Sequence, residues 1–111
     1  MSLKEAFGLP PVIVAKRHVE YDGKEHFFRE LPAIDIEHFY DVFDKDGKRD
    51  AAKSKGLDYR ILAACVVDEA GAPIGTAQEM EQLPARLKVE LTNIAMDVNG
   101  LKTKPEDPAK N

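Results

Sequence analysis

The strongest constraint on the fold of this chain is a helical repeat of apolar residues near its C-terminal end. Between positions 83 and 98, apolar side chains recur at spacings of three and four, which places them along one stripe of a helix. The stripe consists of Leu83, Leu87, Leu91, Ile94, Ala95 and Val98. An apolar stripe of this length has to be buried against another element.

A second amphipathic segment precedes this helix and offers the partner surface. Within residues 57–68, apolar side chains again recur at helical spacing, at Leu57, Ile61, Ala64 and Cys65. We therefore predict that residues 57–68 and the later helix form a helical hairpin, which is the core of the fold.

Three local signals predict where the second helix begins and ends. Residues 76–79 have the form of a capping box, with Thr76 and Glu79 each satisfying a backbone N–H of the first turn. Pro84 suits the first position of a longer helix, so residues 77–82 are predicted to be a short separate turn. Gly100 after Asn99 favours a left-handed C-cap.

The N-terminal part predicts a β-hairpin. Residues 12–19 and 25–31 are rich in β-branched and aromatic residues, and Asp22-Gly23 between them is typical of a two-residue type I′ turn. Such a turn places Val19 opposite His26.

Both faces of this hairpin are apolar. Val12, Val14, Phe27 and Leu31 fall on one face, and Ile13, Val19 and Phe28 fall on the other. Because a two-stranded hairpin is not stable alone, each face needs a cover. Helices of the same chain can cover one face, and a neighbouring subunit or a partner chain can cover the second; the pairing within or between chains is left open.

A further helix is predicted between the hairpin and the helical core. Asp35 can cap it, and Ile36, Phe39, Tyr40 and Phe43 form one apolar face. This face belongs either to the core or to a groove for a partner. Together with the hairpin aromatics, it supplies the residues that we predict to contact a partner: Phe27, Phe28, Phe39, Tyr40 and Phe43.

These elements predict a mainly helical α+β fold in one domain over residues 1–101, with the N-terminal hairpin followed by three to four helices. Residues 1–9 are expected to be loosely held. Residues 102–111 contain two prolines and almost nothing apolar, so we expect a disordered polar tail.

Composition excludes several classes of function. A formal net charge of −4 argues against non-specific binding of nucleic acid, which needs clustered cations. No apolar run approaches the roughly 20 residues that span a bilayer, and no secretory signal is recognisable, so a cytoplasmic location is expected. The single cysteine, Cys65, lies among small apolar residues and is interpreted as a buried side chain rather than a reactive thiol.

No motif for catalysis or for a metal cofactor emerges. A calcium-binding loop could begin at Asp44 and Asp46, but the fifth, sixth and twelfth positions are Lys48, Arg49 and Lys55, which repel a cation. His18 and His26 are predicted on opposite faces of the hairpin, and His38 has no second ligand four residues further on. Neither serine lies in a nucleophile motif, so we expect a non-catalytic protein without cofactors.

Four short stretches resemble the small tail assembly chaperones of long-tailed bacteriophages. They are residues 29–33 (Arg-Glu-Leu-Pro-Ala), 60–71 (Arg-Ile-Leu-Ala-Ala-Cys-Val-Val-Asp-Glu-Ala-Gly), 83–87 (Leu-Pro-Ala-Arg-Leu) and 94–101 (Ile-Ala-Met-Asp-Val-Asn-Gly-Leu). In that family a helix ending in valine, two acidic residues and a nearby glycine precedes a turn, a leucine-proline helix start and a closing asparagine-glycine-leucine.

The resemblance implies a role in assembly. Family members coat the tape measure protein before tail tube subunits polymerise around it, act as oligomers in the host cytoplasm, and are absent from the mature virion. The resemblance therefore implies a tape measure protein, a tail tube protein and further copies of this chain as partners. A longer form made by ribosomal frameshifting at residues 109–111 is a further hypothesis.

Two alternatives to the chaperone stay open. One is a minor structural or connector protein that remains in the phage tail. The other is a small calcium-responsive regulator that uses the Asp44 loop.

Overall fold

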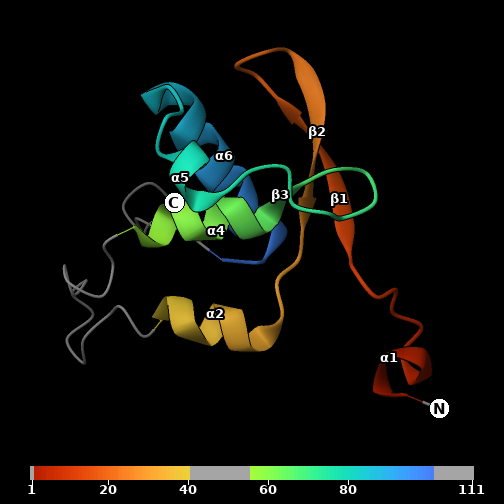
Figure 1. Ribbon diagram of the computed structural model, residues 1–111. Coiled ribbons are helices and arrows are strands. Elements are labelled where there is room, and N and C mark those ends of the chain that lie inside the picture. The colour runs from red at the N-terminus through yellow and green to blue at the C-terminus, as the bar shows by residue number, and fades with distance from the viewer. Residues whose placement is uncertain (1, 41–55, 102–111) are drawn as a thin grey trace, which may run out of the picture.

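The computed structural model describes residues 2–40 and 56–101. Within these residues it has a three-stranded antiparallel sheet and five helices, which confirms the prediction of an α+β fold. The elements are α1 (Leu3–Ala6), β1 (Val14–Val19), β2 (Lys24–Arg29), α2 (Ala33–Tyr40), α4 (Leu57–Cys65), β3 (Val66–Val67), α5 (Ala77–Met80) and α6 (Ala85–Val98). In Figure 1, α4, α5 and α6 gather beside the strands, while α1 stands apart from the other helices.

The strands follow the order β1-β2-β3, with β1 and β2 joined by a four-residue loop. Val19 pairs with Lys24, so the prediction of a two-residue turn with Val19 opposite His26 is wrong. The longer loop closes because the N–H of Gly23, at a φ of +69°, donates to Val19 O over 2.9 Å. A shift by two residues leaves each side chain on its predicted face.

The first helix of the predicted helical hairpin is shorter than expected. Residues 57–68 were predicted as helix, but α4 ends at Cys65, and Val66 and Val67 form β3. These two β-branched residues pair with Phe28 and Phe27 of β2. For Val66 and Val67, pairing with the hairpin as a third strand is therefore more favourable than continuing the helix.

The boundaries of α5 and α6 follow the capping chemistry of the sequence. Thr76 Oγ1 accepts from the Glu79 N–H over 3.1 Å, and Glu79 Oε1 accepts from the Thr76 N–H over 2.9 Å. Helix α6 begins at Ala85, so Pro84 is the N-cap, one position before the predicted one. At the other end Gly100 has a φ of +72°, and Leu101 N–H donates to Met96 O over 2.7 Å, as in a Schellman motif.

Helix α2 begins at Ala33, so Asp35 lies in its first turn and is not the cap that the sequence suggested. Phe43 and the loop that starts at Asp44 lie outside the described residues, as does the segment 102–111 that was predicted to be a disordered tail.

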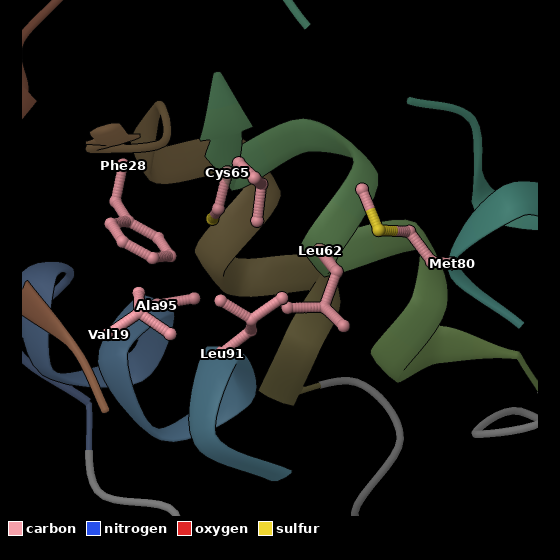
Figure 2. Packing of buried hydrophobic residues seen from close by; sticks show 8 residues of the cluster. Val19, Phe28, Leu62, Cys65, Met80, Leu91 and Ala95 are labelled. Atoms are coloured by element: carbon pink, nitrogen blue, oxygen red, sulfur yellow. The ribbon is translucent and has the colours of Figure 1, made fainter. Parts of the chain in front are cut away.

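The core lies between the sheet and the helices α4, α5 and α6. Figure 2 shows Phe28, Leu62 and Leu91, from three different elements, directed into one space. The cluster of buried residues consists of Val19, Phe28, Leu62, Cys65, Val66, Met80, Leu91 and Ala95. The face of the sheet that carries Val19 and Phe28 is therefore the inner face.

Asn99, just after α6, ties this core to the end of the sheet. Its Oδ1 accepts from the Leu31 N–H over 2.6 Å, and its Nδ2 donates to Ala95 O over 2.9 Å. The same Nδ2 lies 3.6 Å from Cys65 Sγ. One amide side chain thus joins α6, the segment after β2 and the end of α4.

The outer face of the sheet is partly covered by the loop between β3 and α5. This loop folds back so that the buried Gly71 lies against Val12 and Val14. Asp68 holds the loop closed, because its Oδ1 accepts from the N–H groups of Ala70 and Ala72, each over 2.9 Å. Part of the second cover that the hairpin requires therefore comes from the chain itself.

Candidate functional site: an apolar groove beside the hairpin loop

A groove of about 370 Å³ lies between the hairpin loop and the helices α5 and α6. Its walls are mostly apolar and come from segments far apart in the sequence. They are Val19, Val66, Ile74, Met80, Leu83, Leu87 and Leu91. The volume is at the low end of the ~300–1,000 Å³ that ligand pockets occupy, which suits a few apolar side chains.

The helical repeat of α6 explains why this groove exists. Leu91 is buried in the core, whereas Leu87, one turn nearer the start of α6, and Leu83, just before the helix begins, pack against the core and also line the groove. The apolar stripe thus extends past the end of the sheet, which stops at Val19. Met80 adds a flexible thioether side chain that can adapt to different shapes.

The rim of the groove is polar and carries two carboxylates, Asp22 and Glu79, together with His26. His26 Nε2 lies 2.6 Å from Asp22 Oδ2. This hydrogen bond, followed by one from the Lys24 N–H, lowers the pKa of the Asp22 carboxyl. Asp22 is therefore ionised over the physiological range, and the rim attracts a cationic group.

The hairpin loop that forms one wall is held to α6. The Glu90 carboxylate accepts from the backbone N–H groups of Glu20 and Tyr21. Arg86 lies over the Tyr21 ring, with its Cζ 5.6 Å from the ring centroid. These contacts fix the opposite walls of the groove relative to each other.

The structure separates the aromatic residues that we predicted to contact a partner. Phe28 is 0% exposed in the core, so its burial does not fit a direct contact. Phe27 is half-buried on the outer face, opposite Lys16 and Val67. Phe39 and Tyr40 belong to α2, and Phe43 lies outside the described residues.

The described residues contain no group of three or more histidine, cysteine, aspartate or glutamate side chains placed to hold a metal ion. None of the helices described is long and apolar enough to cross a membrane.

Cys65, the single cysteine of the chain, is buried. Its side chain is 0% exposed, and burial raises the pKa of the thiol to about 11. The thiol is therefore protonated at neutral pH and has no access to a substrate. This agrees with the interpretation of Cys65 as a core residue.

The groove could not be predicted from the sequence, because its walls combine the hairpin loop, β3 and two helices. The helical repeat contained one usable signal. Leu83 and Leu87 are the N-terminal members of the apolar stripe, and both line the groove.

Searches against models of protein families, curated proteins and solved structures found no match.

Proposed function

We propose that this protein is a non-catalytic tail assembly chaperone that binds the tape measure protein of a long-tailed bacteriophage in the host cytoplasm and helps to recruit tail tube subunits. The groove beside the hairpin loop is the observation that carries the proposal. A fixed apolar groove with an acidic rim suits the recognition of another protein, whereas the single cysteine, Cys65, is buried.

The mode of binding that fits this groove is helix-in-groove recognition. An amphipathic helix presents apolar side chains at spacings of three and four, and a groove receives them. Ile74 stands at the edge with 56% of its surface exposed, so it can contact such a helix without being part of the core. Asp22 and Glu79 select helices that carry lysine or arginine beside the apolar stripe.

The tape measure protein matches this description because it is long and largely helical, as the resemblance implies. Its apolar stripes would be exposed before the tube forms around it. Covering them one after another with many copies of a small acidic protein would prevent aggregation.

Co-expression tests the proposal. The chain is produced together with the longest predominantly helical open reading frame beside its gene, and the purified material is sized. We expect the two proteins to form a complex that stays in solution and the long protein to precipitate when it is produced alone. Absence of association would refute the tape measure role.

A pair of variants then tests the groove. Ile74→Ser removes an apolar side chain from the groove edge, and Ile34→Ser removes one with the same exposure, 56%, from α2. We expect Ile74→Ser to weaken the complex by about ten-fold, because one buried isoleucine contributes about that much to binding. The control should bind normally; equal binding by both variants would mean that the groove is not the binding surface.

A further inference from the structure

The N-terminal arm, residues 2–11, exposes three large apolar side chains. Leu3 is 76%, Phe7 72% and Leu9 46% exposed. The arm has a defined shape, because Ser2 Oγ accepts from the Glu5 N–H over 3.1 Å, and the Leu9 N–H donates to Lys4 O over 2.8 Å. It therefore presents an ordered apolar surface that its own chain leaves exposed.

The arm and the groove lie at opposite ends of the hairpin. The arm leads into the start of β1, whereas the groove is lined by Val19, at the end of β1, and by the loop residue Asp22. Six strand residues separate these ends by about 20 Å. Figure 1 shows α1 at the lower right and α5 with α6 at the upper left. In this conformation the arm does not fill the groove of its own chain.

The chemistry of the arm complements the groove. Leu3 and Phe7 are four residues apart, so they can project together as a pair of apolar side chains. Lys4 lies between them in the sequence, and its Nζ donates to a carbonyl, Pro11 O, over 3.1 Å. The Glu5 carboxylate accepts from the Ser2 N–H over 2.8 Å, just as the Glu79 carboxylate at the groove accepts from the Thr76 N–H over 2.9 Å. An apolar pair with a lysine matches an apolar groove with a rim of aspartate and glutamate.

We propose that, in the free protein, the arm of one copy inserts Leu3 and Phe7 into the groove of a second copy. The contact is head-to-tail, because two different surfaces meet, so each added copy offers a new groove and a new arm. Such a series closes into a ring or continues as a filament. The surface on each side is small, so association is weak and depends on concentration.

The inference does not rest on the proposed function, because it concerns the protein without its partners. If both hold, the same groove is occupied by an arm before the tape measure protein arrives. The partner helix then displaces the arm, and self-association and partner binding exclude each other.

Sedimentation velocity of the full chain over a wide range of concentration tests the inference. The wild type should gain mean mass as concentration rises. Phe7→Ser in the arm and Ile74→Ser in the groove should each reduce the association constant by about ten-fold or more, since each removes one large apolar contact. Both positions are exposed, at 72% and 56%, so the fold should remain intact. Ile34→Ser is the matched control and should associate like the wild type.

Mixing the two defective variants provides the sharper test. Phe7→Ser retains an intact groove and Ile74→Ser retains an intact arm, so an equimolar mixture should form a one-to-one complex and stop there. A wild type that is monomeric at every concentration would overturn the inference, as would a mixture that does not associate. The Phe7→Ser variant also separates the two proposals, because it should still bind the tape measure protein.

Discussion

Replacing Gly71 by alanine tests how the loop after β3 covers the sheet. Gly71 has a φ of +90°, a left-handed conformation that alanine adopts poorly. A Cβ at this position would lie 2.8 Å from Val12 Cγ1, 3.3 Å from Val12 Cβ and 3.4 Å from Val14 Cγ2. The substitution thus combines backbone strain with a collision against β1 and the residues just before it.

The two contributions can be added from general values. The left-handed backbone costs an alanine about 1–2 kcal/mol. Forcing a methyl group into packed surroundings costs about 1–3 kcal/mol more. Gly71→Ala should therefore lower the free energy of unfolding by about 2–5 kcal/mol, a large share of the ~5–15 kcal/mol typical of a domain.

Urea denaturation followed by circular dichroism measures the loss, and Gly23→Ala is the matched control. Gly23 also has a positive φ, +69°, but a Cβ there would meet no atom within 4 Å. The control should lose only the backbone contribution of about 1–2 kcal/mol. The difference between the two variants is then the cost of the collision.

Adding Val12→Ala to Gly71→Ala completes a double-mutant cycle. The second substitution removes Cγ1, the atom at 2.8 Å, and leaves Cβ at 3.3 Å. The double variant should be more stable than the sum of the single losses predicts, by about 0.5–3 kcal/mol. Equal losses for Gly71→Ala and Gly23→Ala, with no coupling to Val12, would refute the packing of this loop on the sheet.

Three further predictions concern the core. Leu62→Ala should lower the free energy of unfolding, measured in urea, by about 2–5 kcal/mol, because Leu62 is 0% exposed. The control Val89→Ala, at a site that is 54% exposed, should change this free energy by about 0.5 kcal/mol or less. Because the pKa of the Cys65 thiol is raised to about 11 from 9.0, its contribution to stability is complete below pH 9 and is lost as the pH rises to 11. Denaturation at a series of alkaline pH values should show that the free energy of unfolding of the wild type falls by at most about 3 kcal/mol, and Cys65→Ala should abolish this fall. If the free energy of unfolding fell equally with pH in both proteins, the raised pKa of the Cys65 thiol would be contradicted. Asn99→Ala removes the acceptor of the Leu31 N–H, so this amide should exchange its hydrogen faster, and the free energy of unfolding should fall by about 1–3 kcal/mol. An unchanged exchange rate would show that another group accepts the hydrogen bond of the Leu31 N–H.

Short-range signals predicted the start of α5 and the end of α6. The capping box at Thr76 and the left-handed Gly100 depend on residues within a few positions of each other, so the sequence alone contains the information. The same applies to the apolar stripe of α6, whose buried members, Leu91 and Ala95, lie where the helical repeat places them.

Contacts between distant segments account for what the sequence did not predict. Val66 and Val67 continue the apolar pattern of α4, and their pairing with the neighbouring β2 makes them a strand. The hairpin loop was predicted too short because Asp22-Gly23 also fits the end of a four-residue loop. Glu90, far along the chain, supplies acceptors for two of the N–H groups in that loop.

The candidate site was the least predictable part for the same reason. We predicted from the sequence that aromatic residues contact a partner. However, Phe28 is buried, and the groove is lined by aliphatic residues and Met80. A groove is a property of how elements are spaced in three dimensions, and no residue type marks it in a sequence.

The direct passage from α4 into β3 bears on the order in which the chain folds. The hairpin of β1 and β2 involves only near neighbours, so it can form within about 1–10 μs. The third strand joins Phe27 to Val67, and such distant pairings are slow because a long loop must close first. Since Cys65 ends α4 and Val66 begins β3, docking of the helix and completion of the sheet are expected to be one event. The nucleus of the folding reaction should therefore lie at this junction.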